Sequence, residues 1–323
     1  MSPTNGCPVC KSTRTQVRWR GLRDRLFRTT DERFDVAHCR DCRTLFLADI
    51  PPLERLQRYY PDDYWMGPTD RDDRQRAQGG LLEAYRRFVL RDHVRFVGSV
   101  VHGQRLRGEP VRVLDVGCGD GSFLEALGER GACGMDLSLP ALRAVRARGF
   151  TAVRGTLTDC PLTPGSFSLV TAFHFLEHVH PVEPVLAALR ALLAPGGEVV
   201  LQVPNARSLQ AQLLGRFWAG YDVPRHLVDY SDVTLRRTLE QNGFEVLAEN
   251  QHCLRDNPTA FANSLVPGLY PPARLSRGGS GAGVGALLAN LGYLGVTLLC
   301  TPFAVLEALC GRGASVMVHA RPR

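Results

Sequence analysis

Residues Val113–Leu124 read VLDVGCGDGSFL, and this stretch decides the fold. Apolar residues lead into Asp115, and three glycines then follow at alternate positions, Gly117, Gly119 and Gly121. A buried strand that ends in an acid and a glycine-rich turn brings bare backbone against a ligand, because glycine has no Cβ. The helical pattern that begins at Ser122 adds free N–H groups at its first turn. The stretch therefore predicts the nucleotide-binding edge of an α/β sheet.

Short apolar runs bounded by turn residues recur along residues 111–250 and alternate with helical patterns. The predicted strands are Val111–Val116, Ala132–Leu137, Ala152–Gly155, Ser168–Phe173, Gly197–Val203 and Phe244–Asn250. The predicted helices between them are Ser122–Arg130, Pro140–Arg148, Val182–Leu193 and Asp232–Asn242. This alternation predicts an α/β fold, with a mostly parallel sheet covered by helices on both faces. A seventh strand is predicted at Ala314–Ala320, about sixty residues beyond the sixth.

The order of acid and glycines, D-x-G-x-G-x-G, resembles motif I of the class I S-adenosylmethionine (SAM) methyltransferases. The resemblance implies a Rossmann-like, seven-stranded methyltransferase sheet whose last two strands are antiparallel, with SAM as the cofactor. In that family the glycine loop wraps the amino-acid end of SAM. A second acid, Asp136, ends the next predicted strand. In the family an acid at this position binds the ribose of SAM, and a carboxylate can accept hydrogen bonds from both ribose hydroxyls. A glycine-rich turn of another nucleotide-binding α/β domain is the alternative.

The resemblance also implies cofactor contacts at the ends of four predicted strands. Leu157 and Asp159 follow the third strand, where the family contacts adenine. Leu157 is expected to cover the ring and Asp159 to reach its amino group. The predicted cofactor-binding residues are Asp115, Gly117, Cys118, Gly119, Gly121, Phe123, Asp136, Leu137, Leu157, Asp159 and Phe173.

Two Cys-x-x-Cys pairs lie in the first fifty residues, and their members are Cys7, Cys10, Cys39 and Cys42. Four thiolates in two such turns surround one Zn²⁺ tetrahedrally. The intervening residues Thr15–Trp19 and Arg33–His38 are predicted to form a β-hairpin that brings the pairs together. We therefore predict a zinc ribbon over residues 1–50, whose closed site stabilises folding and takes no part in catalysis. Binding of nucleic acid by the ribbon is the less favoured alternative.

Residues 51–108 are predicted to form a linker and a helical lead-in, with the helix over Leu81–Val101. The start of this segment is rich in proline and tyrosine. Together with the ribbon it resembles bacterial methyltransferases that carry an N-terminal zinc ribbon and act on sugars, surface glycans or natural products. Its aromatic residues are expected either to cover the SAM pocket or to pack the ribbon onto the main domain. They are Tyr59, Tyr60, Tyr64 and Trp65.

Methyl transfer from a sulfonium is an in-line displacement, and a hydroxyl or carbon-acid acceptor must also lose a proton. Histidine suits this step because it titrates near neutral pH. The candidates are His174, Glu177 and His178 after the fourth strand and His226 after the fifth, with His226 favoured. The segment from His174 to His178 resembles the Glu-x-x-Glu-His metal site of quinone O-methyltransferases, but a histidine replaces the first carboxylate. No second metal is therefore assigned, and capping or packing roles for these residues are the alternatives.

Residues 254–313 are predicted to be an apolar helical insert, so that the SAM-binding domain comprises residues 109–253 and 314–323. Residues 278–306 carry no charge and are long enough to cross a bilayer. A single crossing would separate the last strand from its sheet, which argues against spanning. Gly292, Gly295 and Pro302 fit a bent helix or a helical hairpin. Two placements stay open: membrane or lipid contact through residues 278–310, and packing on the domain or in a homodimer, which we favour.

The composition is that of a globular protein, with 323 residues, 44% hydrophobic residues and a net charge of +7. No apolar signal segment begins the chain, and its ten cysteines then indicate a reducing compartment. A cytoplasmic location is expected, with peripheral contact at the inner membrane face as the alternative. We predict a SAM-dependent methyltransferase acting on a hydroxyl or carbon acid of a small-molecule, sugar, glycan or natural-product acceptor. The alternatives are a lipid- or quinone-type methyltransferase at the membrane surface and a nucleic-acid-binding protein with a degenerate methyltransferase domain.

Overall fold

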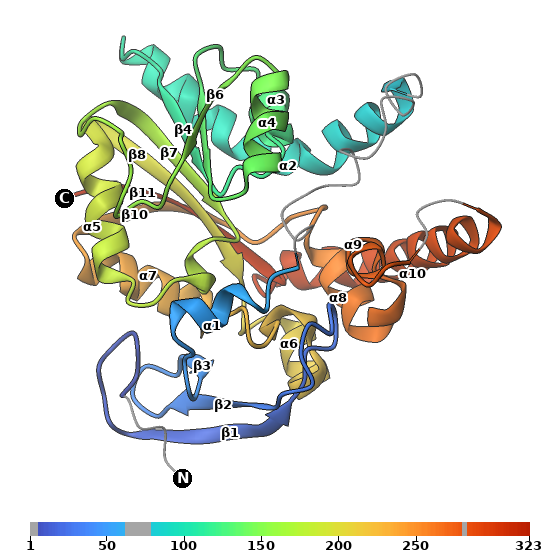
Figure 1. The fold of residues 1–323 in the computed structure, drawn as a ribbon. Helices are drawn as coiled ribbons and strands as arrows, with labels where there is room; N and C mark the ends of the chain where they lie inside the picture. The colour runs from blue at the N-terminus through green and yellow to red at the C-terminus, as the bar shows by residue number, and fades with distance from the viewer. Residues whose placement is uncertain (1–5, 62–78, 280–282) are drawn as a thin grey trace.

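A mixed seven-stranded sheet forms the centre of the protein (Figure 1), seen in a computed structural model that describes residues 6–61, 79–279 and 283–323. The strands are β4 (Val113–Val116), β5 (Cys133–Asp136), β6 (Thr151–Arg154), β7 (Phe167–Phe173), β8 (Leu193–Pro204), β10 (Phe244–Asn250) and β11 (Ser315–Pro322). Their order in the sheet is β10-β11-β8-β7-β4-β5-β6. Strands β4 to β8 run parallel, whereas β11 is antiparallel to both of its neighbours. The predicted fold class and all seven predicted strands are confirmed, with small differences at the strand ends.

Helices cover both faces of this sheet, as Figure 1 shows. One face carries α2 (Gly79–Leu106), α3 (Ser122–Leu127) and α4 (Leu139–Ala147), and the other carries α5 (Glu183–Leu192) and α7 (Asp232–Gln241). Each layer buries apolar side chains against the sheet, for example Leu124 and Val145 on the first face and Leu186 and Leu235 on the second. The sheet is therefore buried on both sides, and its polar groups gather at the strand ends.

Local sequence sets the ends of these helices. α3 stops three residues before its predicted end because Gly128 adopts a left-handed conformation, with φ of 73°, and its N–H bonds to the carbonyl of Leu124. α7 begins with a capping box in which Ser231 and Thr234 accept each other's backbone N–H. The loop before α3 follows β4 directly, at the carboxyl edge of the sheet.

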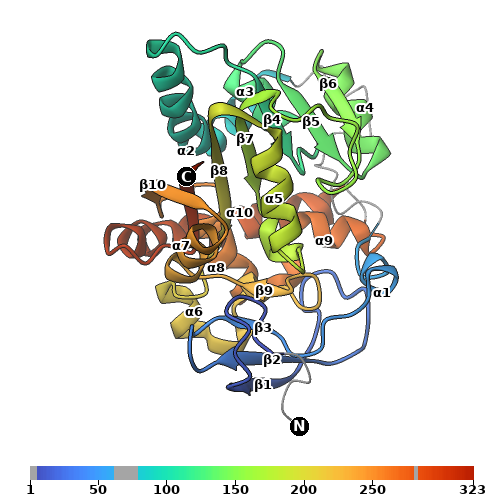
Figure 2. The same ribbon diagram turned by 90° about the vertical axis from the view of Figure 1, so that its left-hand side faces the viewer.

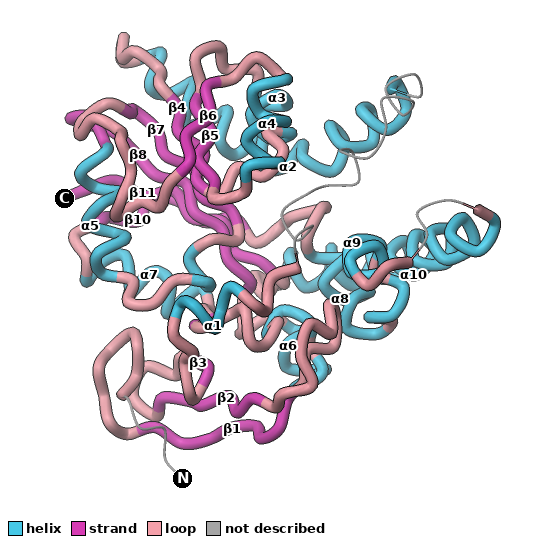
Figure 3. The backbone as a smooth tube through the Cα atoms, in the orientation of Figure 1, coloured by secondary structure: helices cyan, strands magenta, loops and turns pink. Residues whose placement is uncertain are grey.

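A second sheet carries the N-terminal cysteine pairs, and Figure 3 shows its strands beneath the main sheet. It comprises β1 (Thr15–Leu22), β2 (Phe34–Cys39), β3 (Leu45–Leu47) and β9 (Val228–Asp229), in that order. The predicted hairpin is present, since Thr15 pairs with Cys39 and Gln16 with His38. Its fourth strand comes from the segment after β8, so the ribbon shares a sheet with the main domain.

Two short helices flank this junction, α1 (Leu53–Gln57) and α6 (Leu209–Leu214). Tyr59 is buried after α1 and packs edge-on against Phe34 of β2, with ring centroids 5.7 Å apart. The expectation that an aromatic residue packs the ribbon in place therefore fits Tyr59. Of the other three, Tyr60 places its hydroxyl 2.9 Å from His178 Nδ1, and Tyr64 and Trp65 lie outside the described residues.

The insert before β11 is helical, as predicted. It contains α8 (Asn257–Leu265), a 3-10 turn at Pro267–Leu269, α9 (Pro271–Ser276) and α10 (Val284–Leu309). α8 packs against α10, and Figure 1 shows α10 projecting outward beyond α8 and α9, whereas Figure 2 gives the view turned by 90°. The long apolar stretch is one helix with Pro302 inside it, not a hairpin. Among the described residues, α10 is the one helix that length and composition would allow to cross a membrane.

Candidate active site

The four N-terminal cysteines come together as the spacing predicts. The Sγ atoms of Cys7 and Cys42 are 3.4 Å apart, and those of Cys10 and Cys39 are 3.5 Å apart. Tetrahedral zinc with Zn–S bonds of about 2.3 Å requires sulfur atoms about 3.8 Å apart, so the set fits the ion. All four positions would be filled by protein, and a zinc ion here would stabilise the ribbon without an open site for substrate. Zinc binding itself remains a prediction.

The glycine loop after β4 has the backbone conformation that the motif predicts. Gly117, Gly119 and Gly121 have φ values of 70°, 51° and 77°, in the left-handed region that favours glycine. The Gly119 N–H donates to Asp136 Oδ2 at 3.1 Å, and the Ser138 N–H donates to Oδ1 of the same carboxylate at 2.8 Å. The carboxylate at the end of β5 is thereby fixed directly beside the loop. The remaining lone pairs of Asp136 are the acceptors that a ribose would use.

Asp115 has a different environment from Asp136. Its Oδ1 accepts a hydrogen bond of 2.7 Å from the Thr171 hydroxyl on β7, and burial raises the pKa of this carboxyl to about 7. The group is enclosed by protein, with only 3% of the residue exposed. Asp115 therefore ties β4 to β7 beneath the loop, and a direct contact between its side chain and a cofactor stays a prediction.

The other predicted cofactor residues lie at the carboxyl ends of the parallel strands or on α3. Phe123 on α3 packs edge-on against Phe173 at the end of β7, with ring centroids 4.8 Å apart. Leu137 is 56% exposed after β5, which leaves its side chain available to cover a ligand. After β6, the Asp159 side chain is exposed, whereas Leu157 is buried in the core. Of the two predicted adenine contacts, Asp159 thus offers the more accessible side chain.

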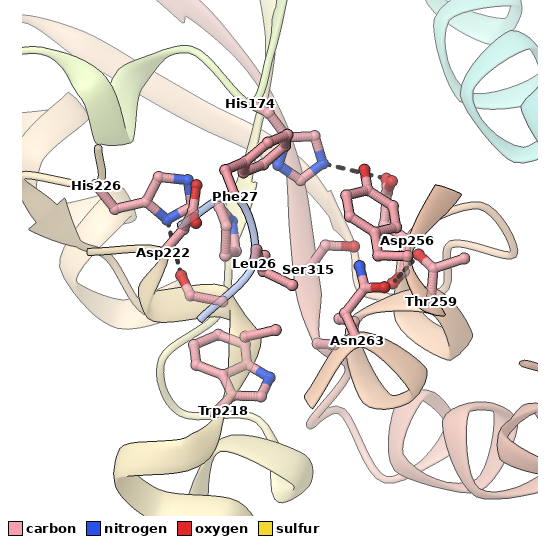
Figure 4. Close-up of a pocket in the computed structure, with 16 residues that line it drawn as sticks. Leu26, Phe27, His174, Trp218, Asp222, His226, Asp256, Thr259, Asn263 and Ser315 are labelled. Atoms are coloured by element: carbon pink, nitrogen blue, oxygen red, sulfur yellow. Dashed lines mark hydrogen bonds and ion pairs between the residues drawn. The ribbon is translucent and has the colours of Figure 1, made fainter. Parts of the chain in front are cut away.

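A cavity of about 290 Å³ opens farther along the same edge of the sheet, beside β7, β8 and β11 (Figure 4). Its apolar wall comes from three segments that are distant in sequence, and comprises Leu26, Phe27, Trp218 and Tyr270. Its polar lining includes His174, Asp222, His226, Asp256 and Asn263. Two of the predicted catalytic residues, His174 and His226, therefore face this cavity. Glu177 is wholly buried behind them.

His226 has the geometry of a general base. Its Nδ1 lies 2.8 Å from the carbonyl oxygen of Gly220, which can only accept, so the proton resides on Nδ1. The Nε2 atom is then an acceptor, and it lies 3.9 Å from Glu177 Oε1. Burial alone would raise the pKa of Glu177, but the hydrogen bond from His174 and the other nearby histidines hold it below its usual range. The carboxylate is therefore charged and would stabilise an imidazolium at His226.

His174 is a cation and not a base. It follows β7 with φ of 52°, a conformation rare for a residue with a side chain. Its Nδ1 lies 3.3 Å from Glu177 Oε1 and its Nε2 lies 3.2 Å from Asp256 Oδ2. Burial opposes the charge, but the two carboxylates outweigh it and raise the pKa of His174 to about 9. At neutral pH this imidazolium has no lone pair with which to accept a proton.

His178 stays neutral behind the cavity. Burial and the neighbouring His226 lower the pKa of His178 to about 4. Its Nδ1 lies 2.9 Å from the Tyr60 hydroxyl and 3.0 Å from the Arg225 carbonyl oxygen. Glu177, His178 and His226 each place a possible metal-ligand atom within 4.8 Å of the others, so this set is compatible with a divalent cation.

The most strongly buried ion pair of the site was not predicted. The Arg225 guanidinium has no exposed surface and bonds to Asp24 at 2.8 and 2.9 Å and to Asp222 at 2.6 and 2.9 Å. It also stacks on Phe27, 4.7 Å from the ring centroid. Arg225 thus joins the ribbon to the loop that carries His226. The sequence holds no signal for this pair, because Asp24 and Arg225 are 201 residues apart.

Asp256 of the insert is the second residue that the sequence analysis missed. Its Oδ2 accepts from Gln202 Nε2 at 2.9 Å and from Cys253 Sγ at 3.0 Å. His93 of α2 in turn lies 2.6 Å from Gln202 Oε1. His93, Cys253 and Asp256 also have the spacing of a metal site, but these hydrogen bonds already pair their polar atoms. The network fixes Asp256 beside His174, and so the insert contributes to the cavity.

A family model described as a methyltransferase domain matches residues 81–249, more than half of the chain. The chain belongs to the methyltransferase-domain family. The matched segment of this methyltransferase contains the glycine loop, Asp136 and all four predicted catalytic residues. The family predicted from motif I is thereby confirmed.

Curated relatives of this methyltransferase include two proteins named ubiquinone biosynthesis O-methyltransferase. That of Idiomarina loihiensis is 35% identical over 113 residues, which are 32% of this chain and 46% of the relative. That of Thiobacillus denitrificans is 37% identical over 134 residues, which are 37% of this chain and 56% of the relative. The chain thus spans about half the length of the curated relatives it matches.

Solved structures resemble this methyltransferase at low sequence identity. A SAM-dependent methyltransferase from Thermotoga maritima, described as a possible histamine N-methyltransferase, is 15% identical with a TM-score of 0.46, covering 82% of this chain and all of that one. A putative sarcosine dimethylglycine methyltransferase from Galdieria sulphuraria is 12% identical with a TM-score of 0.47, covering 71% and 85%.

Proposed function

We propose that this protein is a SAM-dependent O-methyltransferase whose acceptor is a hydroxyl on a lipid-soluble, quinone-type aromatic ring. The single observation that carries the proposal is His226, an imidazole whose acceptor nitrogen is set by Gly220 at the wall of a cavity that also has aromatic sides. The names of the curated relatives support the ring chemistry of the acceptor. The cavity lies along the same strand edge as the predicted cofactor loop.

The chain's own residues divide the chemistry between them. When bound, SAM supplies an electrophilic methyl group on a sulfonium. His226 Nε2 would accept the proton of a hydroxyl bound in the cavity, which would leave the oxygen able to take the methyl group as S-adenosylhomocysteine departs. Glu177 stabilises the resulting imidazolium across 3.9 Å. The proton therefore stays within the His226–Glu177 pair until solvent removes it.

The cation at His174 adds electrostatic stabilisation. A phenol has a pKa of about 10, so its oxygen gains negative charge as the proton leaves. His174 lines the cavity and holds its charge between Glu177 and Asp256. A fixed positive charge at the cavity wall stabilises an oxyanion without reorganisation. Leu26, Phe27, Trp218 and Tyr270 supply the apolar and aromatic walls that an aromatic ring requires.

The test is methyl transfer from SAM to a panel of hydroxylated aromatic rings and, in parallel, to sugar acceptors. We expect wild type to methylate the ring hydroxyls, and His226→Gln to lower kcat by about 10²–10⁴-fold without weakening binding of S-adenosylhomocysteine. His252→Gln is the matched control, because that side chain is 40% exposed and does not line the cavity, and it should retain wild-type kcat. Methylation of sugars alone, or full activity of His226→Gln, would contradict the proposal.

A further inference from the structure

The outward face of α10 is a continuous band of leucines. We call these residues the leucine stripe: Leu287, Leu288, Leu291, Leu294, Leu298, Leu299, Leu306 and Leu309. Each is between 41% and 81% exposed. At 100° per residue the eight positions fall within an arc of about 140°, the width of a helix face that contacts an apolar partner.

The opposite face of α10 holds it to the protein. Cys300, Ala304 and Glu307 are buried there. The Glu307 carboxylate accepts hydrogen bonds from the Gln210 backbone at 3.2 Å and side chain at 2.6 Å. The helix thus reverses the usual pattern, with its acid turned inward and its leucines turned outward. The leucine stripe has no partner among the described residues that buries it.

Charged residues are few in the part of the insert that carries the stripe, and most of them are basic. Residues 257–312 contain four charged residues, Arg274, Arg277, Glu307 and Arg312. Because Glu307 is fully buried, the charges of residues 257–312 that lie near the surface are all arginines, and Arg274 lies beside α10, where it donates to Asn290 Oδ1 at 2.7 Å. Anionic phospholipid headgroups attract such residues and add to the burial of apolar area at a bilayer surface.

The geometry points to an anionic membrane surface as the partner of this helix. We propose that α10 lies in the plane of the bilayer interface, with the leucine stripe in the acyl boundary and the arginines at the headgroups. A transverse orientation would pull Glu307 away from Gln210 and separate β11 from the main sheet. A symmetric dimer through the same stripe would bring the arginines of two copies together without compensating acids.

Docking in this way places the cavity next to the lipid. Tyr293 of α10 donates a hydrogen bond of 2.8 Å to Asn263 Oδ1, and its ring lies 6.0 Å from that of Tyr270. Asn263 and Tyr270 both line the cavity. One layer of side chains thus separates the membrane-facing helix from the acceptor site. This inference rests on the proposed function, which it extends to an acceptor that resides in the bilayer.

The test is flotation of the full-length protein with vesicles of phosphatidylglycerol and phosphatidylcholine, compared with vesicles of phosphatidylcholine alone. We expect wild type to float with the anionic vesicles and the double variant Leu288→Glu/Leu291→Glu to bind at least 10-fold less. The matched control is Leu106→Glu/Leu213→Glu, two leucines outside the insert that are 75% and 67% exposed, which should bind as wild type does. All four leucines are exposed, so circular dichroism should show both variants folded.

Two results would overturn the inference. One is that the stripe variant floats with the vesicles as well as wild type does, or that wild type does not float at all. The other is a wild-type dimer, by light scattering, that the stripe substitutions convert to monomers without any vesicle binding. Methylation of a water-soluble ring hydroxyl, measured without vesicles, separates the two proposals. Flotation without that activity refutes the proposed function, and activity without flotation refutes the membrane docking.

Discussion

Removal of Asp24 should destabilise the whole protein, although this residue lies in the ribbon. Asp24 and Arg225 are both wholly buried at the side chain, and their contacts of 2.8 and 2.9 Å form a paired, bidentate bridge. Arg225 outweighs the effect of burial and holds the pKa of Asp24 below its usual value. The Asp24 carboxylate also accepts the N–H groups of Phe27 at 3.0 Å and Thr29 at 2.9 Å.

The size of the effect follows from these contacts. Breaking a buried ion pair by removing one partner typically costs about 3–5 kcal/mol. Asp222 still neutralises Arg225 in the variant, so we expect Asp24→Asn to lower the free energy of unfolding by about 3 kcal/mol, the low end of that range. Asp24→Ala also removes the acceptors of the Phe27 and Thr29 N–H groups, so its loss of unfolding free energy should reach the upper end of that range. Replacement of all three charged groups, as in Asp24→Asn/Asp222→Asn/Arg225→Met, should recover part of the loss because no unpaired charge then stays buried.

The assay is urea unfolding at pH 7 followed by circular dichroism. Asp35→Asn is the matched control, since Asp35 pairs with Arg20 at 3.3 Å on an exposed face of the same sheet and should cost less than about 1 kcal/mol. The acceptor KM should also rise for Asp24→Asn, because Leu26 and Phe27 of the cavity wall follow this residue. Equal unfolding free energies for Asp24→Asn and Asp35→Asn would refute the reasoning.

Three further predictions concern the histidine cation, the zinc ribbon and the glycine loop. The pKa of His174 is raised from 6.5 to about 9, so its protonation stabilises the folded state fully below pH 6.5, and this stability is lost as the pH rises through about 9. Between pH 7 and 10, the free energy of unfolding should therefore fall more for wild type than for His174→Gln. Cys39→Ser should reduce bound zinc, measured by mass spectrometry, from one ion per chain to a small fraction, whereas substitution of the exposed Cys310 by Ser should leave it unchanged. Gly134→Ala would place a Cβ 2.7 Å from Cys118 Sγ and should weaken binding of S-adenosylhomocysteine, while Gly98→Ala on α2, which meets nothing within 4 Å, should bind as wild type does.

The sequence predicts the main sheet well because its strands are local apolar runs and its glycines mark the turns. The Cys pairs, the hairpin and the loop around Asp136 follow from residue types at short spacings. The cavity is different, since Leu26, Asp256 and Tyr270 reach it from segments that no periodicity connects. His174 could be named as a titratable residue, but its role as a cation depends on Asp256, a residue of the insert. Arg225 illustrates the same limit, because its partner Asp24 belongs to the ribbon.

The insert is predicted only in part by its sequence. Its lack of charge predicts either membrane or lipid contact or packing on the domain or in a homodimer, and we favour packing. α8 does pack against α10, but the leucine stripe faces outward. A helical projection of α10 places small residues such as Ala304 on one face and the leucines on the other. That separation, and not the overall hydropathy, carries the information about the partner.

The most direct test of the account is calorimetric titration of the protein with S-adenosylhomocysteine. We predict one binding site in wild type and at least 10-fold weaker binding in Asp136→Ala, because this carboxylate is fixed at the glycine loop by Gly119 and Ser138. Glu245→Ala on β10, a surface residue paired with Arg321, should bind as wild type does. No binding by the folded wild type, or equal affinities for wild type and Asp136→Ala, would contradict the account.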